Sequence, residues 1–169
     1  MPKVSVIIPV YGVEKYIERC ARSLFEQTLD DIEYLFIDDC TPDQSVEIIN
    51  RVLEDYPLRK NQVVIHRMEH NSGQAAVRKW GMRNATGEYV IHCDSDDWVD
   101  GHMYENMYNK AIKENADVVV CDFYSTGCVK EQRSKGLISQ ERENVIADVL
   151  LWRIAGCLWN KLVRRKVYA

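Results

Sequence analysis

Short apolar segments alternate with amphipathic segments along most of the chain. The apolar segments are rich in β-branched residues, as in Val4–Val10 (VSVIIPV), and the segments between them repeat apolar positions at helical spacing. Strands that alternate with helices, several of them apolar throughout, favour a mostly parallel sheet with helices on both faces. The sequence therefore predicts an α/β fold.

The expected elements can be placed by residue range. Strands are predicted at residues 4–10, 33–39, 63–68, 88–93 and 117–123, and helices at 14–27, 41–56, 73–84, 103–115 and 140–156. Thr41, followed by Pro42, is the expected N-cap of the second helix, and Ser72 that of the third. Gly87 suits the chain reversal before the fourth strand. The polar segment 125–139 is expected to form a surface loop or a hairpin.

Composition limits the class of protein. The chain has 169 residues, of which 46% are hydrophobic, so it is long enough for one domain with a real core. Its formal net charge of −4 argues against a nucleic-acid partner. No apolar run approaches the roughly 20 residues of a membrane span. The six cysteines include no C-x-x-C pair, which indicates free thiols in a reducing cytoplasm.

Polar residues and glycines follow the carboxyl ends of the first four predicted strands. In order along the chain these are Tyr11, Gly12 and Glu14, then Asp38 and Asp39, then Asn71, Ser72 and Gly73, and finally an aspartate cluster. In open parallel sheets, ligands bind beyond the carboxyl ends of the strands. We therefore expect these groups to converge at one edge of the sheet and to form the functional site.

The aspartate cluster lies in the segment DSDDWVD and consists of Asp94, Asp96, Asp97 and Asp100. A single aspartate after a strand is usually a helix cap or a solvated loop residue. Four of them, beside two more at a neighbouring strand end, indicate a positively charged ligand. Mg²⁺ and Mn²⁺ prefer carboxylate oxygens and share their coordination with phosphates. The cluster therefore predicts a site for one of these ions and a phosphate-bearing ligand.

Three segments of the chain resemble the nucleotide-diphospho-sugar glycosyltransferases of family 2. They are VSVIIPVYGVEKYIERCARSLFEQTL, EYLFIDDCTPDQS and HNSGQAAVRKWGMRNATGEYVIHCDSDDWV. The resemblance is close from Lys3 to Phe123 and looser over CLWNKLVRRKVY. One departure is Gly12, where the family usually has Asn. The resemblance implies a GT-A (Rossmann-like) fold and inverting transfer of a sugar, from a UDP-sugar donor, to an acceptor hydroxyl in bacterial surface polysaccharide synthesis.

The resemblance also implies roles for individual residues. The expected contacts of the nucleotide-sugar are Pro9, Val10, Tyr11, Glu14, Asp39, Arg78, Asp94 and Ser95. Tyr11 is expected near the base and Asp39 is expected to accept a hydrogen bond from it, which suits the N–H of uracil. Arg78 is expected to pair with the aspartate cluster or the diphosphate. Asp94 is expected to approach the ribose.

The metal site follows from the same resemblance. Asp96, with Asp94, is the expected ligand of Mg²⁺ or Mn²⁺. Asp97 is expected to contact the sugar or to assist the metal. Asp100 is expected to cap the helix that follows the cluster.

The catalytic base is expected outside the sequence. An inverting transferase needs a general base for the acceptor hydroxyl. The family's base follows the segment that resembles Trp159–Leu162, and no Glu-Asp pair follows it as far as Ala169. The base is therefore expected beyond Ala169, and residues 1–169 are expected to be a single donor-binding domain without the acceptor and base portion. Asp97 is the first candidate base within it.

Two other functions are also consistent with the sequence. One is a module that binds a nucleotide-sugar without catalysis, and the other is a receiver domain, because FIDD precedes a helix. In receivers, however, the Asp pair follows the first strand, and here it follows the second. The acceptor is expected to be a saccharide or a lipid-linked sugar. The basic residues Lys161, Arg164, Arg165 and Lys166 suggest either peripheral contact with the inner face of a membrane or a solvated helix end.

Overall fold

The computed structural model describes residues 1–125, 132–134 and 156–168. The elements are β1 (Val4–Val10), α1 (Ile17–Phe25), β2 (Ile32–Asp38), α2 (Ser45–Glu54), η1 (Pro57–Gln62), β3 (Val63–Arg67), α3 (Gln74–Asn84), β4 (Tyr89–His92), α4 (Met103–Lys113), β5 (Val118–Val120), β6 (Phe123–Ser125), β7 (Gln132–Ser134), β8 (Lys161–Arg164) and η2 (Arg165–Tyr168). The first four strands and the helices between them therefore lie where the sequence pattern places them, to within a few residues.

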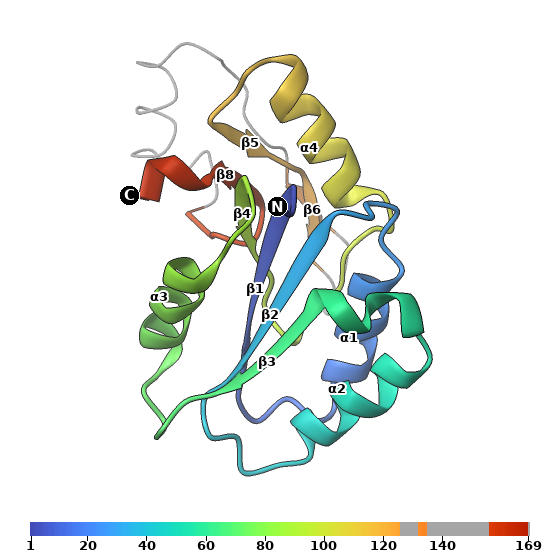
Figure 1. Ribbon diagram of the computed structural model, residues 1–169, viewed down its shortest axis with the longest axis vertical. Coiled ribbons are helices and arrows are strands. Elements are labelled where there is room, and N and C mark those ends of the chain that lie inside the picture. Colours follow the sequence, from blue (N-terminus) through green and yellow to red (C-terminus); the bar gives the residue numbers. More distant parts are fainter. Residues whose placement is uncertain (126–131, 135–155, 169) are drawn as a thin grey trace.

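Six of the strands form one sheet in the order β3-β2-β1-β4-β8-β5 (Figure 1). Strands β1, β2, β3 and β4 are parallel to one another, and β8 lies antiparallel between β4 and β5. The predicted mostly parallel α/β sheet is thus confirmed. Strand β1 is central, so the carboxyl ends of its neighbours meet beside its own carboxyl end.

Helices cover both faces of this sheet, as its alternating side chains require. Val4, Val6 and Ile8 of β1 point into a core that also contains buried residues of α1, α2 and α4. Ile7 points to the opposite face, where Val77 of α3 packs against it. Figure 1 shows α3 on one side of the sheet and α1 and α2 on the other.

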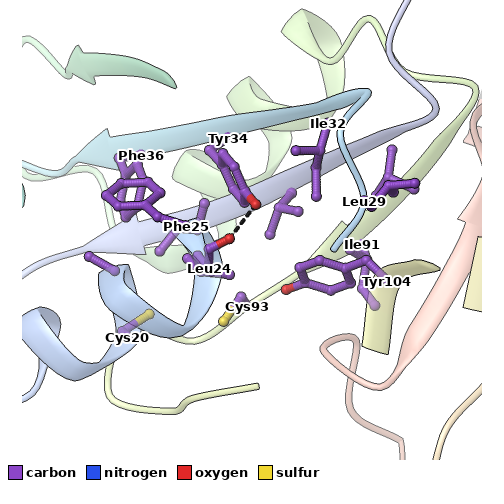
Figure 2. Close-up of a cluster of buried hydrophobic side chains, with 14 of the residues drawn as sticks. Cys20, Leu24, Phe25, Leu29, Ile32, Tyr34, Phe36, Ile91, Cys93 and Tyr104 are labelled. Carbon is purple, nitrogen blue, oxygen red and sulfur yellow. Dashed lines mark hydrogen bonds between the residues drawn. The ribbon is translucent and has the colours of Figure 1, made fainter. Parts of the chain in front are cut away.

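The larger core holds polar atoms as well as apolar ones (Figure 2). The Tyr34 hydroxyl of β2 donates a hydrogen bond to the carbonyl oxygen of Leu24 in α1. The Phe25 ring meets the Tyr34 ring edge to face, with their centroids 5.6 Å apart. A buried tyrosine usually finds a partner for its hydroxyl, and here that partner fixes α1 against the sheet.

The predicted caps of α2 and α3 are wrong. Helix α2 begins at Ser45 rather than near Thr41, whose hydroxyl instead donates to the carboxylate of Asp43 at 2.7 Å. Helix α3 follows Gly73, which has a positive φ of 80°, and the Ser72 hydroxyl donates to the preceding loop. In both cases the residue with capping chemistry serves the loop, because the loop itself carries polar groups that need partners.

The carboxyl-terminal part differs most from expectation. The fifth predicted strand is divided into β5 and β6, and β6 pairs with β7 in a separate two-stranded sheet, so 125–139 contains part of a hairpin. The predicted helix at 140–156 lies, except for its last residue, outside the described residues, as does Ala169. The basic residues expected on a helix end begin in β8, where Arg164 pairs with Glu88 at 3.3 Å and Asp117 at 2.8 Å.

Gly87 is needed for close packing. A Cβ at this position would lie 2.7 Å from the backbone nitrogen of Ser5, and the Gly87 backbone is not in the left-handed region. The Gly87 amide donates to the Ser5 hydroxyl at 2.8 Å. The glycine therefore lets the chain pass directly over the start of β1 before it enters β4.

Within the described part of the chain, no helix combines the length and the apolar character needed to cross a membrane.

Candidate functional site

The loops that follow β1, β2, β3 and β4 are joined at one edge of the sheet. The Asp39 amide donates to the Val10 carbonyl at 3.0 Å, which couples the ends of β2 and β1. The Met68 amide donates to the Asp38 carbonyl at 2.8 Å, and the Cys93 amide donates to the Ile7 carbonyl at 3.0 Å. The predicted convergence of strand ends is therefore present, in the position where open α/β sheets bind ligands.

The loop after β1 carries Tyr11 and Glu14. Tyr11 is 51% exposed, while Val10 beside it is buried and Pro9 is half-buried. Gly12 has a positive φ of 68°, and its amide donates to the Thr41 hydroxyl at 2.8 Å. Both Gly and Asn tolerate this left-handed conformation, which explains why Gly12 can stand where the family usually has Asn.

Glu14 fastens this loop to the start of α2. Its amide donates to the Asp43 carboxylate at 2.9 Å, and its own carboxylate accepts from the Gln44 amide at 3.3 Å. Sequence reasoning missed Asp43, which also accepts hydrogen bonds from Thr41 and Ser45. The spacing Asp43-x-Ser45 before a helix was the available signal, since an Asp side chain often accepts from the amide two residues later.

Asp39 joins the end of β2 to the loop before α3. Its two carboxylate oxygens accept hydrogen bonds from the amides of Ser72 and Gly73, at 2.7 Å and 2.8 Å, and the residue is 4% exposed. An ionised carboxylate offers about four lone-pair sites, so further acceptor capacity remains for a ligand. Asp38 behaves as the expected turn former, because its carboxylate accepts from the Thr41 amide at 2.7 Å.

Arg78 and Asp94 form the predicted ion pair between α3 and the turn after β4. The guanidinium donates from Nη2 to the Asp94 carboxylate, and both side chains are largely buried. The Nε of Arg78 is also buried and has no hydrogen-bond partner within the described structure. The neighbouring Lys79 is exposed, as expected. A diphosphate bound at this turn would compete with the Asp94 carboxylate for the Arg78 guanidinium.

The remaining aspartates of the cluster lie in or after a turn. Ser95 is buried, whereas Asp96 and Asp97 are exposed. Partial desolvation, and then the charges of Asp96 and Asp94, raise the pKa of the Asp97 carboxyl above its ordinary value. A cation at the turn would relieve this repulsion. Asp100 is not the predicted cap of α4, whose N-cap is His102. Its carboxylate accepts from the His102 amide at 2.9 Å and thus serves the turn before that helix.

The described residues contain no group of three His, Cys, Asp or Glu side chains placed to hold a metal ion by themselves. Mg²⁺ and Mn²⁺ do not require such a cage, since they are commonly bound by one or two carboxylates together with waters and ligand phosphates. The crowded carboxylates of Asp94, Asp96 and Asp97 therefore fit an ion that is shared with a diphosphate. They do not fit an ion held by protein alone.

A cavity of about 870 Å³ lies beside the aspartate turn and is large enough for a small ligand. Its lining includes Asp94, Asp97, Trp98, Asp122 and Trp159. An aromatic residue after a strand is more often part of the core, but Trp98 is 39% exposed. The guanidinium of Arg19 lies over its ring, 3.1 Å from the centroid, and a cation over an indole face is a stable arrangement at an exposed site.

His92 also lines this cavity, and sequence reasoning did not single it out. It is 1% exposed, and burial, together with the charge of Arg78, lowers the pKa of its imidazole to about 4. The side chain is therefore neutral at pH 7. The only signal in the sequence was a histidine at the end of an otherwise apolar strand.

The expected catalytic base is not among the residues that the structure describes. It is expected beyond Ala169, and the described residues end at Tyr168, so the structure does not test this prediction. Asp97, the candidate base within the domain, lies in the wall of the cavity. Its raised pKa is a property that general bases share, although the same repulsion also suits a metal site.

The chain belongs to glycosyl transferase family 2, because the model of that family matches residues 5–168. Among its relatives, the glycosyltransferase EpsJ of Bacillus subtilis (strain 168) is 33% identical over 176 residues. That alignment covers 99% of this chain and 49% of EpsJ, so the chain spans about half the length of this relative. Membership of this family removes the receiver-domain hypothesis.

Solved structures show the same fold. S. aureus TarS 1-349, in complex with UDP-GlcNAc, superposes on this chain with a TM-score of 0.77 at 24% identity. The match covers 98% of this chain and 46% of the TarS chain. Mannosyltransferase PcManGT from Pyrobaculum calidifontis, in complex with GDP-Man and Mn2+, has a TM-score of 0.63 at 25% identity. This match covers 71% of the present chain and 35% of the PcManGT chain. The predicted GT-A fold is therefore confirmed.

Proposed function

We propose that this domain binds the donor of a glycosyltransferase, a UDP-sugar, and that the whole protein transfers the sugar to an acceptor hydroxyl with inversion. The observation that carries the proposal is the convergence of Asp39, Arg78 and Asp94 beside the end of β1, within one connected set of loops. Family membership supports the reaction class, and the complex of TarS with UDP-GlcNAc supports the class of donor.

Each group of the site has a part in holding the donor. Tyr11, whose ring is exposed, covers the base, Pro9 and Val10 line the same pocket, and Glu14 braces this loop. Asp39 uses its remaining acceptor capacity for the N–H of uracil. Asp94 and Ser95 approach the ribose, while Arg78 exchanges part of its pairing with Asp94 for the diphosphate.

A divalent cation, Mg²⁺ or Mn²⁺, is proposed at Asp96, with Asp94 as a second carboxylate. When bound, such an ion neutralises the charge that develops on the departing diphosphate. The complex of PcManGT with GDP-Man and Mn2+ supports a cation for this chain. So does the pKa of Asp97, which partial desolvation raises first and the charges of Asp96 and Asp94 raise further. Asp97 lies beside the cavity, where it contacts the sugar or assists the ion.

The acceptor side completes the proposal. Transfer with inversion requires a general base beside the acceptor hydroxyl. We assign it to a part of the protein beyond Ala169, and Asp97 is the alternative among the described residues. The acceptor is a saccharide or a lipid-linked sugar of surface polysaccharide synthesis, and the protein acts in the cytoplasm, at the inner face of the membrane.

A calorimetric titration tests the donor assignment. The purified protein is titrated with UDP and with ADP, each with and without Mn²⁺. UDP is expected to bind at least about tenfold more tightly than ADP, which corresponds to about 1.4 kcal/mol and to roughly one good hydrogen bond from a charged group. Equal affinities would exclude the base-reading role of Asp39, and absence of binding to either nucleotide would exclude the proposed function.

A further inference from the structure

The side chain of Gln27 joins the end of α1 to the start of α4. Gln27 follows the C-cap residue of α1 and is 3% exposed. Its Nε2 donates to the Ser23 carbonyl at 3.1 Å and to the Asp100 carbonyl at 2.6 Å. Its Oε1 accepts from the Tyr104 amide at 3.3 Å. A carboxamide has two N–H donors and one carbonyl oxygen, so both ends of this buried group are engaged.

The bond to Tyr104 supplies a cap that α4 does not have from its own N-cap residue. The first amides of a helix have no partner within the helix, and the side chain of the N-cap residue commonly accepts from one of them. The N-cap residue of α4 is His102, which makes no side-chain cap hydrogen bond. Gln27 therefore provides an acceptor from another element, and the start of α4 is fixed relative to α1.

One side of α1 also holds the aspartate turn, residues 94–100. The Ser23 hydroxyl accepts from the Val99 amide at 3.2 Å, and the guanidinium of Arg19 lies over the Trp98 ring. Arg19 and Ser23 are four residues apart, so they lie on the same face of the helix. The carboxyl half of the turn is thus held from α1, at a side chain, at a backbone amide and, through Gln27, at a backbone carbonyl.

The opposite end of α1 leads to the proposed base-binding loop. The loop that carries Tyr11 and Glu14 runs directly into the helix, which begins at Ile17, and the Ile17 amide donates to the Val13 carbonyl at 2.9 Å. One short helix therefore connects the loop that is proposed to bind the base with the turn that is proposed to bind the cation. The contacts of α1 set how far apart these two parts of the site lie.

We propose that Gln27 and Ser23 are positioning residues of the donor site, which hold the aspartate turn where its carboxylates share a cation with the diphosphate. The proposal rests on the proposed function, namely binding of a UDP-sugar together with Mg²⁺ or Mn²⁺. Neither residue is assigned a contact with the donor. Asp96 and Asp97 are exposed, so their carboxylates are placed by the backbone of the turn. A displacement on the order of 0.5 Å is enough to weaken a site of this kind.

A positioning role and a purely structural role predict different results. If the contacts of α1 only stabilise the fold, their loss lowers the melting temperature and leaves the effect of Mn²⁺ on UDP binding unchanged. If they position the turn, the effect of Mn²⁺ falls as well, because the ion needs protein carboxylates and ligand phosphates in one coordination shell.

The test measures the dissociation constant of UDP by calorimetry, with and without Mn²⁺, and the melting temperature of each variant. Gln27→Met keeps a side chain of similar length but loses all three hydrogen bonds. The ratio of the constant without Mn²⁺ to the constant with Mn²⁺ is expected to fall roughly fivefold, within the range that one hydrogen bond contributes. Ser23→Ala is expected to lower this ratio in the same direction, and Ser23→Thr, which keeps the hydroxyl, is expected to retain it.

Ser5→Ala is the matched control. Ser5 is 0% exposed, its hydroxyl accepts from the Gly87 amide at 2.8 Å, and the same hydroxyl donates to the Glu33 carboxylate. It lies near the start of β1, at the opposite end of the strands from the aspartate turn. The melting temperature of this variant is expected to fall, while its ratio is expected to equal that of the unmutated protein.

The outcomes separate this inference from the proposed function. An unchanged ratio in Gln27→Met overturns the inference, as does an equal loss of the ratio in Ser5→Ala. Should Gln27→Met not fold, the inference stands only if Ser23→Ala lowers the ratio and Ser23→Thr retains it. If the unmutated protein binds UDP equally well with and without Mn²⁺, the cation and the positioning role both fail while nucleotide binding stands. If it does not bind UDP, the proposed function fails and this inference fails with it.

Discussion

The carboxylate of Asp43 accepts a hydrogen bond from the backbone amide of Glu14, at 2.9 Å, and so joins the loop after β1 to the start of α2. The same carboxylate accepts from the Thr41 hydroxyl at 2.7 Å and from the hydroxyl of Ser45 at 2.6 Å. The loop that carries Tyr11 is thus held by an acidic residue to which the family resemblance assigned no role. The stability of this loop, and the ability of the domain to bind a nucleotide, are expected to depend on Asp43.

Replacing Asp43 with alanine is expected to lower the free energy of unfolding by on the order of 2 kcal/mol, because hydrogen bonds to a charged group are lost and amides are left without acceptors. Denaturant titration measures this change. Asp30→Ala is the control, since Asp30 is exposed and its carboxylate makes no hydrogen bond or ion pair in the described structure. Equal effects of the two replacements would contradict the role of Asp43.

The same carboxylate predicts a pH dependence. Burial alone would raise the pKa of Asp43, but hydrogen bonds from Ser45, Thr41 and the Glu14 amide outweigh it and lower the pKa from 3.8 to about 2. Because the folded-state pKa lies below the unfolded one, the stabilisation is complete above the unfolded value and is lost as the pH falls toward about 2. As the pH falls from 3.8 to about 2, the melting temperature of the unmutated protein is expected to fall more steeply than that of Asp43→Asn. Parallel curves would show that Asp43 is not the group concerned.

The convergence of the site was predictable because it follows from topology. Once β1, β2, β3 and β4 are parallel, the residues after each strand must meet at one edge, and Asp39 and the aspartate turn are placed without knowledge of any contact. The Arg78–Asp94 ion pair was predictable for a similar reason. Arg78 lies one turn into α3, beside the end of β4, and a buried guanidinium requires an anion.

Other features depend on long-range contacts that leave little trace in the local pattern. The segment KLVRR has no strict alternation and so indicates a helix end, whereas the position of β8 between β4 and β5 is decided by tertiary pairing. Thr41 and Ser72 have the chemistry of caps, but the acceptors and donors of neighbouring loops compete for them. That the ring nitrogens of His92 have no hydrogen-bond partner among the described residues could not be known from the sequence.

The close passage of Gly87 over β1 predicts an effect of adding one methyl group. In Gly87→Ala the new Cβ would lie 2.7 Å from the Ser5 nitrogen, so backbone must shift, at a cost of about 1–3 kcal/mol. Gly156→Ala is the matched control, because a Cβ there would meet no atom of the described residues within 4 Å and its φ is not positive. Thermal denaturation is expected to show a clear loss of stability for the first variant and little change for the second. A loss of the same size in both would mean that the close approach is not the cause.

The aspartate turn predicts different roles for two carboxylates, those of Asp96 and Asp100. Asp96 is exposed at the turn beside Asp97, whose pKa is raised by partial desolvation and then by the charges of Asp96 and Asp94. The carboxylate of Asp100, in contrast, already accepts a hydrogen bond from the His102 amide at 2.9 Å. A cation bound with a diphosphate would therefore use Asp96 and not Asp100. In Asp96→Ala, the affinity for UDP is expected to become nearly the same with and without Mn²⁺. In Asp100→Ala, the ratio of the UDP affinities with and without Mn²⁺ is expected to stay within a few-fold of its value in the unmutated protein.

The measurement is again a calorimetric titration with UDP in the presence and absence of Mn²⁺, together with a melting curve for each variant. Asp100→Ala is expected to cost some stability, on the order of 1 kcal/mol, because the turn before α4 loses its acceptor. Asp96→Ala is expected to leave stability unchanged or to increase it, since one of the mutually repelling charges is removed. The two variants thus separate a ligand of the ion from a structural carboxylate by opposite effects on stability and binding. If UDP binds the unmutated protein equally well with and without Mn²⁺, the metal role fails for the whole cluster; if Asp100→Ala abolishes the effect of Mn²⁺, the ion is held farther along the turn than Asp96.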